Sequence, residues 1–234
     1  MIKYSISAVI LAYNEQNNIT PLIKKTDRVL KQKFFDYEII VVNDGSQDNT
    51  LSVLKELTLK YPKLKIVTHT QNKGYGAAVV SGLKTSQYEL VFFTDGDNQF
   101  NVEEINKLLP YIDDSDLVAG YRVKRSDNFF KRINTLAWNI LIRFLFKVKV
   151  KDLDCAFKLF RKTILEKIDL RRVKSQGAMI NAEILVRLKK VDAKIVEVPV
   201  SHFHRKFGKQ TGASLKVIAK AFKELAMFYR ELHN

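Results

Sequence analysis

Two carboxylates and a side-chain amide stand close together in the middle of the chain, directly after a short apolar run. The run, Leu90–Thr94, is bounded by polar turn residues and predicts a buried strand that ends in a loop. Asp95, Asp97 and Gln99 then supply hard oxygen ligands of the kind that Mg²⁺ or Mn²⁺ takes, with water and a substrate phosphate as the remaining ligands. Gly96 lets the backbone approach a ligand closely. An ordinary Asp/Gly turn is the alternative, but open α/β sheets bind ligands at this end of a strand.

The element that carries this cluster is one of several strands expected in the first half of the chain. Helix-length segments separate four apolar runs, which are Ser5–Ala12, Glu38–Val42, Leu64–Thr68 and Leu90–Thr94. Strands that alternate with helices of about 10–15 residues predict an α/β fold, in which helices cover both faces of a mostly parallel sheet. A late strand is expected over Ala193–Val198, after a helix over Ser175–Lys190.

Each of these strands is followed by polar residues. Parallel strands bring their carboxyl ends to one edge of the sheet, so we expect Tyr13, Glu15, Asp44 and Asp95 to converge there. Glu15 and Asp44 are suited to accept hydrogen bonds from a base or a ribose. For Asp44, a role as a turn or capping residue is the alternative. The convergence of four clusters favours a ligand site more than any single motif does.

Lys73-Gly74-x-Gly76 precedes a predicted helix. A lysine charge and the N–H groups of a helix terminus suit a diphosphate, although two glycines alone are more typical of a plain loop. The full phosphate-loop and dinucleotide-binding fingerprints are absent from the sequence, which disfavours an NTPase or a dehydrogenase.

The positive charge is concentrated in the second half of the chain. The 234 residues carry a net charge of +15, whereas residues 1–119 hold 13 Lys and Arg against 15 Asp and Glu. This asymmetry indicates an anionic partner for residues 120–234, either nucleic acid, lipid headgroups or a phosphorylated substrate, with a merely solvated basic surface as the alternative. The single Cys155 cannot form an intramolecular disulfide, and we find no signal peptide or membrane-spanning run. A soluble or peripheral protein is therefore expected.

Two basic amphipathic segments lie in this second half. Phe129–Val150 mixes aromatic residues with Lys and Arg and predicts one helix, or two short ones, in a membrane interface; the inner face of an ordinary helix is the alternative. The other segment, Leu215–Leu232, is expected to be a helix that packs on the domain, on another subunit or on lipid. Its apolar stripe comprises Leu215, Ile218, Phe222, Leu225 and Tyr229. Val200–Gly212 is a polar, glycine-containing segment of the kind that closes over substrates.

The ordered motifs resemble those of family 2 glycosyltransferases of the GT-A fold. The matching segments are AYNE at 12–15, NDGSQDNT at 43–50, NKGYGAA at 72–78, TDGDNQF at 94–100, RIN at 132–134, DLDCAFK at 152–158, Glu183, EVP at 197–199 and His204-Arg205 with Gly208. Within the family they are most similar to the branch that transfers sugars to polyprenol phosphates. The resemblance covers nearly the whole chain and implies one GT-A domain over residues 1–234, with a nucleotide-sugar half at 1–119 and an acceptor and membrane-facing half at 120–234.

The resemblance implies a metal-dependent, inverting transfer from a UDP- or GDP-sugar to a polyprenyl phosphate at the cytoplasmic face of a membrane. The donor would bind at Ala12, Tyr13, Glu15, Asp44, Lys73, Gly74, Asp95 and Gly96, and Mg²⁺ or Mn²⁺ at Asp95, Asp97 and Gln99. The candidate catalytic residues are Asp97, Arg125, Arg132, Asp154 and Arg205. Arginine suits bidentate contacts to the phosphate of an acceptor, which needs no strong base.

Other functions stay open at this point. A glycosyltransferase that acts on a hydroxyl acceptor would need a base, for which Asp152 or Asp154 is the first choice. A non-catalytic nucleotide-sugar binder or a nucleic-acid binder are further alternatives, but no nucleic-acid-binding motif is visible, and we expect no nucleic acid partner. A homo-oligomer formed through the C-terminal helix is a further expectation.

Overall fold

The computed structural model describes residues 3–123, 129–177, 179–208 and 215–233, without the side chains at 129–134, 215, 216 and 218. The strands are β1 (Ile6–Ala12), β2 (Tyr37–Asp44), β3 (Leu64–His69), β4 (Leu90–Asp95), β5 (Leu117–Arg122), β6 (Phe157–Arg161) and β7 (Ile195–Val200). The α-helices are α1 (Ile19–Lys33), α2 (Thr50–Lys60), α3 (Tyr75–Thr85), α4 (Ile105–Leu108), α5 (Phe129–Phe146), α6 (Lys162–Lys167), α7 (Met179–Lys190) and α8 (Leu215–His233). Short 3₁₀ turns, η1 (Val102–Glu104) and η2 (Leu109–Tyr111), flank α4.

The strands form one sheet in the order β3-β2-β1-β4-β6-β5-β7. Strand β6 runs antiparallel to both of its neighbours, and the other pairs are parallel, so the expectation of a mostly parallel α/β sheet is confirmed. The strands β5 and β6 were not expected from the sequence. They are short, and an apolar run of that length does not distinguish a strand from a buried helical turn.

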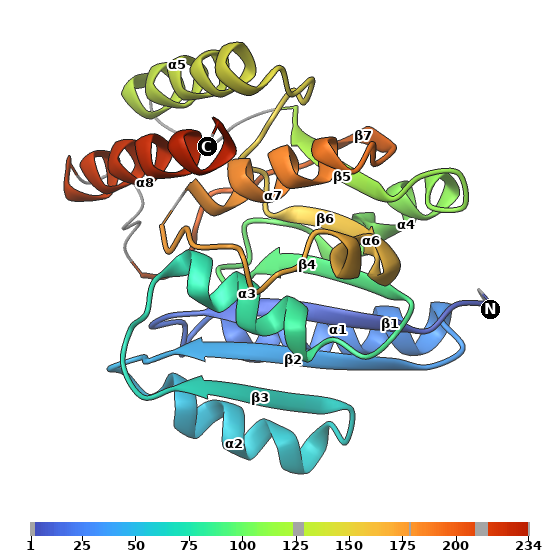
Figure 1. Ribbon diagram of the computed structural model, residues 1–234. Coiled ribbons are helices and arrows are strands. Elements are labelled where there is room, and N and C mark those ends of the chain that lie inside the picture. The colour runs from blue at the N-terminus through green and yellow to red at the C-terminus, as the bar shows by residue number, and fades with distance from the viewer. Residues whose placement is uncertain (1–2, 124–128, 178, 209–214, 234) are drawn as a thin grey trace.

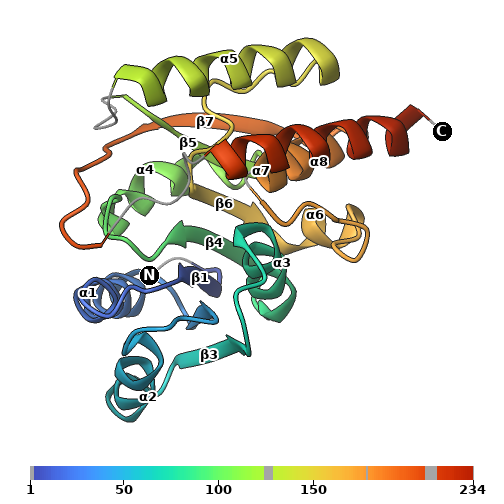
Figure 2. The ribbon, with the colours of Figure 1, turned by 90° about the vertical axis from the view of Figure 1, so that its left-hand side faces the viewer.

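Helices cover both faces of the sheet (Figures 1 and 2). Helices α1, α2 and α4 lie on one face, and α3, α6 and α7 lie on the other. The C-terminal helix α8 packs on the outer side of α7, and α5 lies beside α8. Where β4 meets β6, Phe92 and Phe157 pack edge to face with ring centroids 4.8 Å apart.

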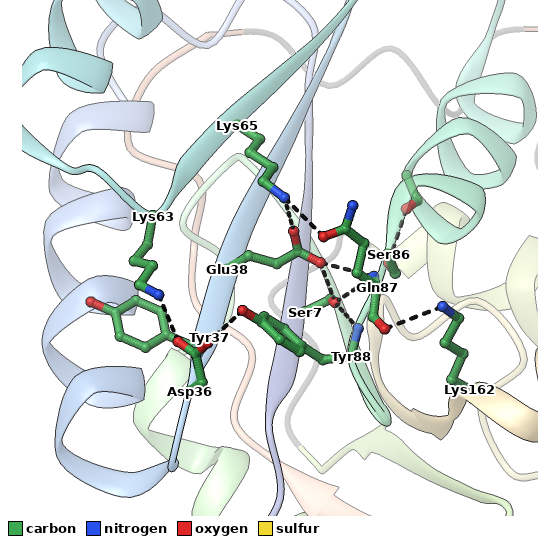
Figure 3. Close-up of polar contacts among 11 residues, drawn as sticks. Ser7, Asp36, Tyr37, Glu38, Lys63, Lys65, Ser86, Gln87, Tyr88 and Lys162 are labelled. Atoms are coloured by element: carbon green, nitrogen blue, oxygen red, sulfur yellow. Dashed lines mark hydrogen bonds and ion pairs between the residues drawn. The ribbon is translucent and has the colours of Figure 1, made fainter.

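A polar network ties together the amino ends of β1, β2 and β3 (Figure 3). The buried Glu38 accepts hydrogen bonds from the Ser7 hydroxyl at 2.6 Å and the Gln87 N–H at 2.9 Å, and it forms an ion pair with Lys65 at 2.7 Å. A buried carboxylate needs such partners to offset its loss of hydration. The network therefore anchors the turn before β4 at the end of the sheet opposite the polar clusters.

Next to this network, Asp36 accepts hydrogen bonds from the Tyr88 hydroxyl at 2.6 Å and from Lys63 at 2.7 Å (Figure 3). The hydrogen bond from Lys63, followed by that from Tyr88, lowers the pKa of Asp36 to about 2. Asp36 therefore stays ionised, and its contacts connect the start of β2 to the start of β3 and to the turn before β4.

The basic amphipathic segments form helices, as expected. The residues of α8 that are buried differ in part from the expected apolar stripe. Over Phe129–Val150 the structure has a single helix, α5, which ends at Phe146. The expected stripe of α8 is wrong for Phe222, which is 50% exposed, whereas Leu225 is buried together with Ala221 and Phe228. The rings of Phe222 and Tyr229 turn toward α5 instead, where they contact Trp138 and Phe146. The expected stripe positions Leu215 and Ile218 have side chains outside the described residues.

Among the helices of the described residues, none has the length and apolar character needed to cross a bilayer.

Candidate active site

The carboxyl ends of β2, β1 and β4 lie side by side and bring the acidic residues to one edge of the sheet (Figure 1). The register places Leu11 of β1 opposite Asp95 of β4, and Ala12 opposite Asn43, the residue before Asp44. Tyr13 follows β1 directly, and Glu15 lies two residues further along the chain. The convergence expected from the sequence is therefore present in the structure.

Asp95 is the last residue of β4. Burial, together with the neighbouring charge of Asp97, raises the pKa of Asp95 to about 7, while Tyr75, Lys158 and Arg122 act in the opposite direction. Its Oδ1 atom is buried and has no hydrogen-bond partner. Because a buried carboxylate oxygen without a partner is costly, its position calls for a cation or another donor.

The structure gives a further reason for glycine at position 96, besides the close approach to a ligand expected from the sequence. Its N–H donates to the Leu11 carbonyl oxygen at 2.8 Å, and a Cβ atom at this position would lie 2.4 Å from that oxygen. The close approach that glycine permits here is therefore to the backbone of β1, which fixes the loop that carries Asp95 and Asp97.

The pair Asp95 and Asp97 fits a hard divalent cation. Such an ion accepts carboxylate oxygens and completes its shell with water and a diphosphate. No group of three or more His, Cys, Asp or Glu in the described residues is arranged to hold a metal by itself. The Nε2 of Gln99 donates to the Phe203 carbonyl oxygen at 2.8 Å, a bond that uses the nitrogen of the amide and not the oxygen that a metal would take.

Arg205 enters the site from the far end of the chain. Its Nη2 lies 2.7 Å from Glu15 Oε1, and its Nη1 lies 3.6 Å from Asp97 Oδ2. Burial raises the pKa of Glu15, and the hydrogen bond from Asn18 and the charge of Arg205 oppose this rise. The guanidinium thus lies between a candidate donor-binding acid and a candidate metal-binding acid.

The segment that carries Arg205, residues 201–208, is fastened on both sides of the site. Phe203 N–H donates to the Gln99 carbonyl oxygen at 2.8 Å, and the Asn18 amide donates to the Phe207 carbonyl oxygen at 3.2 Å. Gly208 has φ +81°, and a Cβ atom there would lie 2.6 Å from Arg205 Nη2. The described part of the expected closing segment therefore lies across the acidic cluster; residues 209–212 are outside the described residues.

Asp44 has three hydrogen-bonding partners within the protein. It accepts the N–H groups of Lys73 and Gly74 at 2.9 Å each, and it lies 2.6 Å from His69 Nδ1. The N–H of Gly76 donates to the Gln176 carbonyl oxygen at 2.8 Å. The N–H groups of Lys73, Gly74 and Gly76 thus have partners within the protein, and Lys73 is exposed.

The second pair of acids comprises Asp152 and Asp154, which have different surroundings. Asp152 forms a two-pronged ion pair with Arg122 at 2.6 and 2.7 Å, which makes it unsuitable as a general base. Asp154 is half-buried and lies close enough to Tyr75 to influence its pKa. Arg125 lies outside the described residues, and Arg132 lies in α5 with its side chain outside them.

The sequence reasoning missed residues that support the acidic cluster from behind. They are Tyr75, Arg122, Lys158 and Asn181, and each is linked to the aspartates directly or through a hydrogen-bonded neighbour. A signal was present, because a lysine within the apolar run FKLF is unusual in a strand that is buried on both sides.

The sheet topology and the acidic pair at the end of β4 define a glycosyltransferase of the GT-A fold. The model of the family described as "Glycosyl transferase family 2" matches residues 7–169, so the chain belongs to that family. The resemblance inferred from the sequence motifs is thereby confirmed.

Curated relatives are similar over most of this chain. A dolichyl-phosphate beta-glucosyltransferase of Trichomonas vaginalis is 28% identical, covering 95% of this chain and 71% of its own length. An undecaprenyl-phosphate 4-deoxy-4-formamido-L-arabinose transferase of Pseudomonas fluorescens is 29% identical over 94% of this chain, which spans only 63% of that protein. Both relatives are named for polyprenol-phosphate acceptors.

Solved structures share the fold. Glucosyl-3-phosphoglycerate synthase from Mycobacterium tuberculosis, solved with Mn²⁺ and UDP-glucose, superposes with a TM-score of 0.72 at 17% identity, covering 96% of this chain and 78% of that one. Mannosyl-3-phosphoglycerate synthase from Rubrobacter xylanophilus gives a TM-score of 0.75 at 16% identity, covering 98% and 75% respectively. At these identities, the comparison establishes the fold.

Proposed function

We propose that this protein transfers a sugar from a UDP- or GDP-sugar to a polyprenyl phosphate, with inversion at the anomeric carbon and with Mg²⁺ or Mn²⁺ as cofactor. The observation that carries this proposal is the placement of Arg205 against Glu15 and Asp97. It brings a phosphate-binding cation from the basic half of the chain to the acids of the donor half. The curated relatives support the acceptor class.

The residues present suit a phosphate acceptor. A phosphate monoester is already anionic near neutral pH, so its oxygen attacks the anomeric carbon without a strong base. Two anionic substrates repel each other, and Arg205 is placed to neutralise part of that charge. Asp152, one of two candidate bases for a hydroxyl acceptor, is held by Arg122.

Asp95 and Asp97 would hold the divalent cation, which when bound stabilises the charge of the departing nucleoside diphosphate as a Lewis acid. The oxygen ligands at this edge of the sheet therefore fit a hard divalent cation. The Oδ1 of Asp95, which has no hydrogen-bond partner, is the oxygen best placed to bind it. The amide oxygen of Gln99 is the third proposed ligand, and the amide is held in place by the bond from its Nε2 to the Phe203 carbonyl oxygen.

The expected outcome of a substrate screen tests this function directly. UDP- and GDP-sugars are incubated with the protein, with and without undecaprenyl or dolichyl phosphate, in Mn²⁺, Mg²⁺ or EDTA, and the lipid product is measured. We expect a product only with a polyprenyl phosphate and a divalent cation. A product that forms equally well in EDTA contradicts the metal assignment, and transfer only to hydroxyl acceptors contradicts the acceptor.

A lipid acceptor requires that the protein reach a membrane surface, and α5 carries exposed residues suited to bind one. Leu136, Ile140 and Phe144 recur at helical spacing and are 58%, 56% and 80% exposed. Lys147 and Lys149 follow the helix and are exposed as well. Each lysine near an anionic leaflet contributes on the order of 1 kcal/mol. This arrangement supports peripheral attachment through α5 to a membrane surface, which in this proposal is the cytoplasmic face.

Binding to anionic vesicles should accordingly be lost when Ile140 and Phe144 are both replaced by serine. These side chains are preferable to Trp138, which packs against Phe222 and would disturb the fold. Co-sedimentation at low and high salt measures the effect. Leu59→Ser is the matched control, because Leu59 is an exposed apolar residue on α2, remote from α5. Equal loss in both variants, or no binding by the unaltered protein at low salt, contradicts the assignment of α5.

The same proposal includes a single domain in which residues 1–119 bind the nucleotide sugar and residues 120–234 face the acceptor and the membrane.

The homo-oligomer through α8 stays a prediction. In this structure α8 packs on α7 and α5 and leaves Met227 exposed.

A further inference from the structure

A buried histidine lies beside Asp44 at the carboxyl end of the sheet. His69, the last residue of β3, is the partner of Asp44 in the strand register, so both side chains project from the same face of the sheet. His69 is 8% exposed and Asp44 is 4% exposed. The Nδ1 atom of the ring lies 2.6 Å from Asp44 Oδ1. Because both groups are shielded from water, this hydrogen bond is stronger than it would be on the surface.

The other ring nitrogen of His69 is held by the helix that covers this face. Helix α3 packs on β1 and β2, and the Ser81 hydroxyl oxygen of α3 lies 2.9 Å from His69 Nε2. The next residue, Gly82, lets the helix come this close, because a Cβ atom there would collide with the Val9 side chain. The ring is thus held at both nitrogens, from the sheet on one side and from the helix on the other.

These contacts decide which ring nitrogen donates to the carboxylate. Asp44 also accepts the N–H groups of Lys73 and Gly74, so its oxygens act as acceptors and His69 Nδ1 carries a proton. The Ser81 hydroxyl can donate or accept, and it therefore suits Nε2 with or without a proton. In both states of the ring, the proton on Nδ1 is directed at Asp44 Oδ1.

The same bonds leave a defined part of the Asp44 carboxylate for a ligand. Each carboxylate oxygen has two acceptor positions. Oδ1 uses both, for His69 Nδ1 and for the Lys73 N–H, whereas within the described residues Oδ2 accepts only the Gly74 N–H. One acceptor position on Oδ2 is thus left for a single N–H or O–H donor. The base and the ribose of a nucleotide both carry donors of this kind.

We propose that His69 and Ser81 are positioning residues, which hold the Asp44 carboxylate so that its Oδ2 accepts one hydrogen bond from the nucleoside of the sugar donor. This inference rests on the nucleotide-sugar donor of the proposed function. Neither residue touches the nucleotide, because His69 acts through Asp44 and Ser81 acts through His69. Without the bond from Nδ1, the carboxylate is held only by the loop at 73–74, and Oδ2 loses its fixed direction.

The test compares two substitutions of the same histidine. In His69→Asn, the side-chain NH₂ takes the place of Nδ1 and keeps a donor to Asp44. In His69→Gln, the NH₂ lies near the place of Nε2, and the donor at Nδ1 is lost. Calorimetric titrations with UDP and with GDP in Mn²⁺ measure affinity, and thermal unfolding measures stability. For the nucleotide that the unaltered protein binds, we expect about tenfold weaker binding in His69→Gln and at most about a threefold loss in His69→Asn.

Ser81→Ala tests the second contact. We expect a smaller loss of affinity than in His69→Gln, and no further loss when the two substitutions are combined, because Ser81 acts only through the ring and its Nδ1 donor. His233→Gln and Ser52→Ala are the matched controls, since they make the same exchanges at exposed positions on α8 and α2. Both controls should bind the nucleotide as the unaltered protein does.

The 2′,3′-dideoxy form of the same nucleotide identifies the group that donates to Asp44. If His69→Gln weakens the binding of the normal and the dideoxy form equally, the hydrogen bond comes from an N–H of the base. If His69→Gln leaves the binding of the dideoxy form unchanged, the bond comes from a ribose hydroxyl. Either result supports the proposal.

Equal affinity in His69→Gln and His69→Asn, whether unchanged or reduced, overturns the proposal, because the donor at Nδ1 then decides nothing. If His69→Gln does not fold, Ser81→Ala decides, and unchanged affinity in that variant overturns the proposal. Failure of the unaltered protein to bind either UDP or GDP overturns it together with the proposed donor. If nucleotide binding responds to the variants as expected but no sugar is transferred to any polyprenyl phosphate, the positioning role is supported and the proposed acceptor is wrong.

Discussion

Replacing Asp97 by alanine is expected to reduce sugar transfer by more than a hundredfold. The lost carboxylate is one of two that fit the divalent cation, and stabilisation of a leaving diphosphate by a metal is worth several kcal/mol of the barrier. Asp97 also receives the Gln99 N–H at 3.0 Å, so Asp97→Asn is the better-matched second variant because its side-chain oxygen can keep that bond. Initial transfer rates and calorimetric titration of UDP with and without Mn²⁺ measure the effect.

The control for this prediction is Asp114→Ala, which removes an exposed acid outside the site. It should leave both the rate and the metal dependence unchanged. Full transfer activity in Asp97→Ala, or nucleotide affinity that is the same in Mn²⁺ and in EDTA, would show that Asp97 does not serve a metal.

Replacing Arg205 by alanine is expected to slow transfer to polyprenyl phosphate by roughly ten- to a hundredfold, with nucleotide binding nearly intact. A charge-assisted contact to a desolvated phosphate is worth on the order of 1.5–3 kcal/mol. The lysine variant should recover only part of the activity, because an ammonium cannot reproduce the two-pronged geometry of a guanidinium. Steady-state rates at varied acceptor concentration separate weaker acceptor binding from a slower chemical step.

The comparison that decides the acceptor class is between Arg205→Ala and Asp154→Asn, with Arg171→Ala as the control. Arg171 is an exposed arginine paired with Asp169, away from the acidic cluster. If Asp154→Asn abolishes transfer in a folded protein while Arg205→Ala is silent, a base is required. The acceptor is then a hydroxyl rather than a phosphate.

The sequence alone determined the edge of the sheet at which the site lies. Apolar runs that alternate with helices predict parallel strands, and parallel strands place Glu15, Asp44 and Asp95 at a common edge whatever the details of packing. Each of these inferences uses information that is local in the chain, namely the period of a segment and the residues that follow it. This is why they survive comparison with the structure.

Tertiary structure decided which partner each of these residues meets. Asp44 stays a candidate for the base or ribose, and the fold adds partners that the sequence does not indicate, namely the N–H of Lys73 and the ring of His69. Gln99 stays a candidate metal ligand, and the fold decides how its amide is held, because its Nε2 donates to the carbonyl oxygen of Phe203, 104 residues away. A side chain with several hydrogen-bonding atoms has many possible partners, and only the folded chain brings one of them near.

The contacts of two further residues also depend on the fold. Arg205 reaches Glu15 across 190 positions, and Lys158 is buried because β6 enters the sheet between β4 and β5. Local periodicity does not indicate the partners of either residue, since it shows which face of a segment is buried and not what lies against that face. The position of the site therefore follows from the chain, whereas the charges that surround its carboxylates follow from how distant segments pack.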